Sequence, residues 1–210
     1  IDSGGASNYV DGSGNTWVSD RVYTSGSFGY VGGNAFSTSS AIANTNDDQL
    51  YQTNRYATSF EYRFDVPAGN YQATLKFAEI LSQSFGVGLR VFNVSIENVP
   101  VLVNYDIYAE AGANTATDKI FNTTVADGTL NIRFAVVKSR AAVNAIEVLS
   151  IAQDTMPPTV FITNPANSAT VNGLVTVSAN ASDNIGVAGV QFLLDWVNLG
   201  AEDTTFPYST

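Results

Sequence analysis

The sequence contains no cysteine, no histidine and a single methionine. Without cysteine the chain can form no disulfide, zinc–thiolate site or thiol nucleophile. Without histidine it has neither the commonest general base nor the commonest transition-metal ligand. It also has no apolar run near the roughly 18 residues that a membrane-spanning helix needs. These absences argue against most kinds of catalytic, redox and metal centre.

Basic residues are scarce as well. Nine Lys and Arg stand against nineteen Asp and Glu, which gives a net charge of −10. Nucleic acids and anionic membranes require a basic surface, so we expect neither as a partner, and an acidic polysaccharide is disfavoured for the same reason. Only 13% of the residues are charged, while Ser, Thr, Asn and Gly are plentiful. This composition is typical of secreted, β-rich modules, and we expect a secreted bacterial protein that a large core stabilises without disulfides.

The most regular patterning lies between Gln49 and Glu97. Apolar residues occupy every second position from Phe60 to Val66 and again from Tyr71 to Phe77, a period typical of half-buried strands. The turn residues 67–70 between the two runs predict an antiparallel hairpin with one apolar face. A third run, at 90–97, alternates in the same way, and such strands need a second sheet to cover them.

Further strands are expected along the rest of the first 151 residues, and no segment predicts a convincing helix. They are expected at 17–18, 41–42, 101–105, 120–125, 130–136 and 143–151, with a second hairpin turn at Asp127-Gly128. Eight or nine strands without helices indicate an all-β protein, for which a jelly-roll β-sandwich is the economical architecture.

Several short sequence motifs of this chain resemble those of a known family. They are IDSGG at 1–5, DGSGNTW at 11–17, LYQTNRY at 50–56, LKFAE at 75–79, RVFNV at 90–94 and NAIEVL at 144–149. In this order and spacing they resemble the signature of malectin and the malectin-like carbohydrate-binding modules of family 57. The resemblance implies a jelly-roll β-sandwich, residues 1–153, that binds carbohydrate and has no catalytic activity.

The composition changes near Gln153. Residues 154–158, Asp-Thr-Met-Pro-Pro, predict a linker, and no Lys or Arg follows it. Residues 159–210 resemble the opening half of a bacterial immunoglobulin-like repeat, with strands expected at 159–163, 174–181 and 189–194. A complete domain needs about seven strands over about 100 residues, so we expect an incomplete one. Its uncovered apolar residues predict packing on the first domain, self-association through an open edge, or poor order.

The candidate sugar-binding residues combine aromatic rings with polar side chains. The apolar face of a pyranose stacks on a ring, while its hydroxyls form directional hydrogen bonds. The resemblance places Tyr56 where a malectin tyrosine stacks on glucose, and it places Tyr30 and Phe36 in a Gly-rich segment where malectin offers another aromatic. Tyr56 could equally be a packing residue. Asp48 and Arg55 could bind sugar, or they could cap a turn and pair with an acid.

The sequence departs from malectin at two places in this site. After Glu79, an aromatic pair that helps malectin hold its sugar is replaced by Ile80-Leu81-Ser82, and a malectin acid falls near Ser139 or Arg140 here. We therefore do not expect this chain to bind malectin's own ligand, the glucose disaccharide end of an N-glycan. Arg140 or Gln83 could supply replacement hydrogen bonds.

We predict neither catalysis nor a required cofactor. Glycoside hydrolysis needs two carboxylates about 5 to 9 Å apart in a cleft, and no catalytic signature surrounds any acid of this chain. Glu79, an acid on an apolar strand face, predicts a buried, hydrogen-bonded structural residue. The loop 11–15 faintly resembles the start of a calcium loop but lacks its distal glutamate. It is either a structural calcium site or a Gly-Ser hairpin turn.

The function that follows is targeting. We expect a non-catalytic module that holds a multimodular secreted protein, through its covalently linked modules, on a neutral, glucose-like oligo- or polysaccharide. The alternative is a structural or adhesive spacer. A concave face with exposed rings would favour sugar binding, whereas burial of Tyr56 and Phe36 would favour the spacer.

Overall fold

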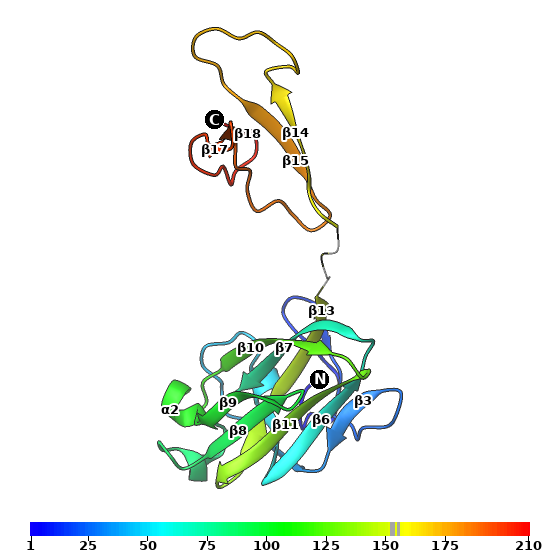
Figure 1. Cartoon of the computed structure of the whole chain (residues 1–210). Coiled ribbons are helices and arrows are strands. Elements are labelled where there is room, and N and C mark those ends of the chain that lie inside the picture. Colours follow the sequence, from blue (N-terminus) through cyan, green and yellow to red (C-terminus); the bar gives the residue numbers. More distant parts are fainter. Residues whose placement is uncertain (152–153, 155) are drawn as a thin grey trace. The chain divides into compact units, whose positions relative to one another are not determined.

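The computed structural model describes residues 1–151, 154 and 156–210 (Figure 1). The chain forms two compact units, one ending at Ile151 and the other running to Thr210. The domain limits expected from the sequence, 1–153 and 159–210 with a linker at 154–158, stay a prediction, because residues 152, 153 and 155 lie outside the described part of the chain.

The first unit is a sandwich of antiparallel sheets, which confirms the expected all-β fold. One layer has the strand order β3-β6-β11-β8-β9, and the facing sheet has the order β10-β7-β13 (Figure 1). The strands of the first layer are β3 (Phe28–Val31), β6 (Ser59–Asp65), β8 (Val91–Ile96), β9 (Val99–Tyr105) and β11 (Thr129–Lys138). Those of the second are β7 (Gly69–Phe77), β10 (Thr117–Val125) and β13 (Ala145–Ile151).

The core lies between these two sheets. Side chains at alternate positions of each strand point inward, and the largest of them are fully buried. They include Tyr62, Phe92 and Phe134 of the first layer and Leu75, Phe77 and Ile146 of the second. Full burial of each such side chain stabilises the fold by about 1.5–3 kcal/mol.

A third sheet with the order β12-β5-β4 and several short elements complete the first unit. Its strands are β4 (Asn34–Ser37), β5 (Thr53–Ala57) and β12 (Ala141–Val143). The short elements are the hairpin of β1 (Tyr9–Val10) and β2 (Thr16–Trp17), the helices α1 (Asp48–Tyr51) and α2 (Ile107–Ala111), and the 3-10 turn η1 (Ser82–Ser84). No helix of the described residues is long and apolar enough to cross a membrane.

Both expected hairpins are wrong. Strand β6 pairs with β3 and β11, whereas β7 pairs with β10 and β13, so residues 66–68 cross between layers. Asp127-Gly128 likewise joins β10 of one layer to β11 of the other. Alternating apolar residues give each strand one face to bury, and consecutive strands in opposite layers bury these faces against each other. Within each layer, a strand forms its backbone hydrogen bonds with strands that are distant in the sequence.

Two smaller expectations also differ from the structure. The strand expected at 41–42 is irregular chain beside a single bridge between Ala43 and Thr115, although Ile42 is buried. The tight hairpin of the sandwich instead joins β8 to β9 at Glu97-Asn98. Both turn residues have positive φ, 50° and 62°, as a two-residue type I′ turn requires.

The second unit is a small β-structure with a core of its own. Its sheet has the order β14-β15-β18, formed by β14 (Thr159–Asn164), β15 (Ser178–Ser182) and β18 (Tyr208–Ser209). Strands β16 (Leu193–Leu194) and β17 (Val197–Asn198) form a separate hairpin. Ala179, Val190, Phe192 and Tyr208 form the core. The strand expected at 159–163 is confirmed as β14, while the other two are shorter than expected.

Candidate functional site

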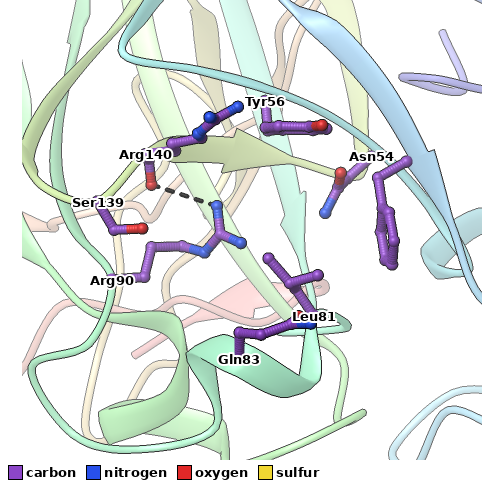
Figure 2. A pocket seen from close by; sticks show the side chains of 8 residues that line it. Asn54, Tyr56, Leu81, Gln83, Arg90, Ser139 and Arg140 are labelled. Carbon is purple, nitrogen blue, oxygen red and sulfur yellow. Dashed lines mark hydrogen bonds between the residues drawn. The ribbon is translucent and has the colours of Figure 1, made fainter.

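A pocket of about 270 Å³ lies against the sheet β12-β5-β4 (Figure 2). Its lining comes from β4, β5, the segment after β7, the residue before β8 and the turn between β11 and β12. The lining residues are Phe36, Asn54, Tyr56, Leu81, Gln83, Arg90, Ser139 and Arg140. Four other hollows are larger, at about 330 to 750 Å³. Two of them are lined mainly by apolar side chains, and the other two have no aromatic side chain among their described lining residues. The first combines rings with several polar side chains, so we take it as the candidate site.

Two aromatic rings share the face of the sheet that borders this pocket. In the pairing of β4 with β5, Phe36 lies opposite Asn54 and Asn34 lies opposite Tyr56. Directly opposed residues point to the same face of a sheet, as do residues two apart in one strand. Phe36, Asn54 and Tyr56 therefore all face the pocket. Both rings are half-buried, so each keeps an exposed surface on which a ligand could stack.

A buried ion pair lies at the base of the pocket. Arg90 Nε donates to Glu79 Oε2 at 2.6 Å, and Arg90 Nη2 donates to Oε1 at 3.3 Å. Arg90 Nη1 also donates to the carbonyl oxygen of Arg140 at 3.2 Å (Figure 2). Glu79 Oε1 accepts the Leu81 N–H at 3.0 Å. Burial raises the pKa of Glu79, and the Arg90 charge opposes that shift. Through these hydrogen bonds the pair connects the segment after β7, the residue before β8 and the turn between β11 and β12. The prediction that Glu79 is buried and hydrogen-bonded is confirmed.

Polar groups of a different kind lie around the rings. The side chains of Gln83, Ser139 and Arg140 are exposed, and the Arg140 guanidinium lies 5.2 Å from the centre of the Tyr56 ring. Asn54 is only 1% exposed, and its Oδ1 has no hydrogen-bond partner among the described residues. A buried amide without a partner is costly, so a ligand that bonds to it would recover that cost.

Two of the residues expected in the site lie elsewhere in one structural cluster. Arg55 points to the opposite face of β5 from Tyr56, where its Nε donates to Asp20 Oδ2 at 2.7 Å. Its guanidinium lies 3.1 Å from the centre of the Tyr30 ring, and Tyr62 Oη donates to Asp20 Oδ1 at 2.9 Å. Neither Arg55 nor Tyr30 lines the pocket. Adjacent residues of a strand point to opposite faces, so Arg55 and Tyr56 cannot share one site.

Asp48 also lies away from the pocket. It is the first residue of α1, and its Oδ2 accepts the backbone N–H of Ile42 at 3.1 Å. Of the six residues expected in the site, the structure thus brings Tyr56, Phe36 and Arg140 together. It leaves Tyr30, Arg55 and Asp48 in contacts that stabilise the fold.

The calcium-like loop 11–15 is the turn of the hairpin β1–β2. Asp11 Oδ1 accepts the N–H groups of Ser13 and Asn15 at 2.9 and 2.8 Å, and Asp11 Oδ2 accepts Trp17 Nε1–H at 2.9 Å. These hydrogen bonds, that of Trp17 first, lower the pKa of Asp11 to about 2. Across residues 1–151, 154 and 156–210, no group of three or more Asp and Glu side chains is placed to hold a metal ion.

Asn54 and Arg90 were not expected in the site from the sequence, although both lie in the words that carry the family resemblance. The sequence does indicate Asn54, because residues two apart in a strand point to the same face and Asn54 lies two residues before Tyr56. No comparable sequence pattern indicates that Arg90 lines the pocket. Its position depends on an ion pair with Glu79, which lies on a different segment of the wall.

Comparison with known proteins agrees with this architecture. Residues 1–154 match the Malectin domain, and residues 158–210 match the Bacterial Ig domain. Malectin-A of Xenopus laevis is 34% identical over 95 residues, covering 43% of this chain and 33% of that protein. Malectin of Homo sapiens is also 34% identical over 95 residues, covering 43% of this chain and 31% of that protein. The chain spans about a third of the length of these curated relatives.

Solved structures show the same sandwich. The β-glucuronidase of Bacteroides uniformis superposes with a TM-score of 0.68 at 30% identity, over 72% of this chain and 18% of that chain. The ANX1 ectodomain of Arabidopsis thaliana superposes with a TM-score of 0.59 at 16% identity, over 73% and 48%, which shows a likeness of fold alone. The match over residues 1–154 and the sandwich that these residues form show that the chain belongs to the malectin domain family of carbohydrate-binding modules, followed by a bacterial immunoglobulin-like domain.

Proposed function

We propose that the pocket beside β5 binds the end of a glycan and thereby holds a larger, secreted protein on it. The observation that carries this proposal is the pair of half-buried rings, Phe36 and Tyr56, on one sheet face beside exposed polar side chains. Sugar rings are bound by this combination, since their C–H faces stack on aromatics and their hydroxyls need directional partners. A spacer would need neither.

The size of the pocket favours a terminal sugar unit. Pockets for small ligands measure about 300 to 1,000 Å³, and this one, at about 270 Å³, is slightly smaller. Two or three ring contacts with a few hydrogen bonds correspond to about −4 to −8 kcal/mol, or roughly millimolar to micromolar affinity. Such weak binding suits a module that acts together with others in one chain, where several sites raise the avidity.

The proposed role is attachment without catalysis. None of the described carboxylates lines the pocket, and Glu79, beneath it, is bound to Arg90. The β-glucuronidase of Bacteroides uniformis carries the similar fold as 18% of its own chain, which supports a place for this module within a larger carbohydrate-active protein. Malectin and bacterial immunoglobulin-like domains in one chain support secretion.

The test is a binding screen of the full chain against neutral and acidic glycans, with Tyr56→Ala as the site variant. We expect binding that Tyr56→Ala weakens at least tenfold, because the variant removes one of the two stacking surfaces. The matched control is Tyr108→Ala, which removes a half-buried tyrosine of α2 whose ring stacks on Phe85 outside the pocket. A folded protein that binds no glycan would support the spacer instead.

A further inference from the structure

The charge of the pocket differs in sign from that of the chain. Among the residues that the structure describes, its lining contains two arginines and no aspartate or glutamate, although the whole chain carries a net charge of −10. The Arg90 charge is balanced, because Glu79 lies against it in the buried pair. Arg140 forms no ion pair with any described residue, and its side chain is exposed. One positive charge of the pocket is therefore left without a counter-charge.

Other hydrogen-bond donors line the same pocket. Figure 2 shows Arg140 beside the Tyr56 ring and the amide nitrogen of Asn54 turned toward the pocket, and Ser139 lines the pocket as well. The Oδ1 of buried Asn54 has no hydrogen-bond partner within the described residues; as an acceptor it suits a hydroxyl of the same sugar, not the carboxylate. A guanidinium with neighbouring N–H and O–H donors is the arrangement that binds a carboxylate, since charge-assisted hydrogen bonds are about twice as strong as neutral ones.

We propose that this pocket selects a sugar unit that bears a carboxylate, such as a terminal uronic acid. The sugar ring would stack on Phe36 and Tyr56, and its carboxylate would pair with Arg140. The proposal rests on the proposed function, because it assigns the ligand class of the same glycan site. It replaces the neutral ligand that the net charge alone favours.

The negative net charge of the chain does not oppose such a ligand at close range. At physiological salt, charges on the surface are screened beyond about 8 Å. The carboxylate of a bound sugar would lie in contact with Arg140, while the acid nearest the base of the pocket is Glu79, already paired with Arg90. Local charge therefore decides selectivity, and the distant acids mainly slow the approach of an acidic glycan at low salt.

The experiment compares acidic glycans with their carboxyl-reduced forms. Polygalacturonate, glucuronoxylan, hyaluronan and alginate oligosaccharides are each titrated into the full chain, beside the same oligosaccharides with every uronate reduced to the hexose. Reduction changes only the carboxylate. We expect at least one acidic form to bind about tenfold more tightly than its reduced partner, with the difference shrinking as salt rises.

Two arginine variants locate the effect. Arg140→Gln should remove the preference, so that the acidic and reduced forms then bind this variant within about twofold of each other, whatever its overall affinity. Arg133→Gln is the matched control, since it removes one exposed arginine of β11 that lies outside this pocket. It changes the net charge equally and should leave the preference intact.

The outcomes separate this inference from the proposed function. If reduced and neutral glycans bind as tightly as acidic ones, or if Arg140→Gln keeps the preference, the inference is overturned while the glycan site stands. If no glycan binds and Tyr56→Ala changes nothing, both fail.

Discussion

At the residue scale, neighbouring positions of one strand have opposite roles. Tyr56 faces the pocket, whereas Arg55 faces the interior and joins Asp20 and Tyr30. Both lie in the segment LYQTNRY at 50–56, which therefore combines a residue that lines the pocket with one that makes a structural contact. A place in this segment does not by itself make a polar residue a candidate binding residue.

Arg55→Ala tests this division. The variant leaves the Asp20 carboxylate buried without its cation, and breaking a buried pair in this way costs about 3–5 kcal/mol. We expect the free energy of unfolding, measured by urea denaturation, to fall by that amount, while glycan affinity at low temperature changes less than twofold. Arg63→Ala, at a more exposed pair with Glu61, serves as the control and should cost no more than about 1 kcal/mol. Lost binding with unchanged stability would instead assign Arg55 to the site.

At the element scale, the sandwich depends on a few turns that require left-handed backbone. Glu97 and Asn98 join β8 to β9 with φ of 50° and 62°. Glu97 Oε1 also accepts the N–H of Asn131 at 2.7 Å, so this turn is held to the neighbouring strand β11. Asparagine tolerates the left-handed region better than other residues with a Cβ, and glycine adopts it freely.

Substitution of Asn98 should follow that ranking. Asn98→Ala is expected to lower the free energy of unfolding by about 1 kcal/mol, because alanine adopts positive φ at a cost of about 1–2 kcal/mol. Asn98→Gly should be neutral or slightly stabilising. The two variants differ by one methyl group, so thermal unfolding of the pair isolates the backbone contribution. Equal stability of the two would show that the turn does not need the left-handed conformation.

At the scale of the whole molecule, the second unit differs from the first in how much apolar surface it leaves uncovered. All six residues of β14 are exposed, including Val160, Phe161 and Ile162 at about 60% each. Strand β14 is also an edge of its sheet. An exposed apolar edge strand is a template for pairing with another strand.

We therefore expect the chain to self-associate through β14 of two copies. Sedimentation velocity should show a weight-average coefficient that rises with protein concentration, and Phe161→Ser should reduce that rise. The control is Val137→Ser, which removes an exposed apolar side chain of β11 in the first unit and should have no effect. A sedimentation coefficient independent of concentration would contradict the prediction.

The positions of several strands and their buried faces can be predicted from local sequence patterns, without information on tertiary contacts. Alternating apolar residues indicate where β6, β7 and β8 run and which face each buries, because side-chain direction in a strand has a period of two. The family resemblance then indicates a sandwich. Of the six site residues predicted from the sequence, three line the pocket, namely Tyr56, Phe36 and Arg140. Glu79, an acid on an apolar strand face within one of the family motifs, is predicted to be buried and hydrogen-bonded, although its partner Arg90 is not predicted.

Only the tertiary structure decided which strands pair and which polar residues meet. The turns after β6 and β10 look like hairpin turns but cross between layers, because the partner of each strand edge is far away in the sequence. The same holds for the pocket. Glu79 neutralises Arg90, whereas Arg140 forms no ion pair within the part of the chain that the structure describes. The overall charge of −10 is a sum over the chain, whereas a ligand meets the charges within a few ångströms, and folding alone brings those together.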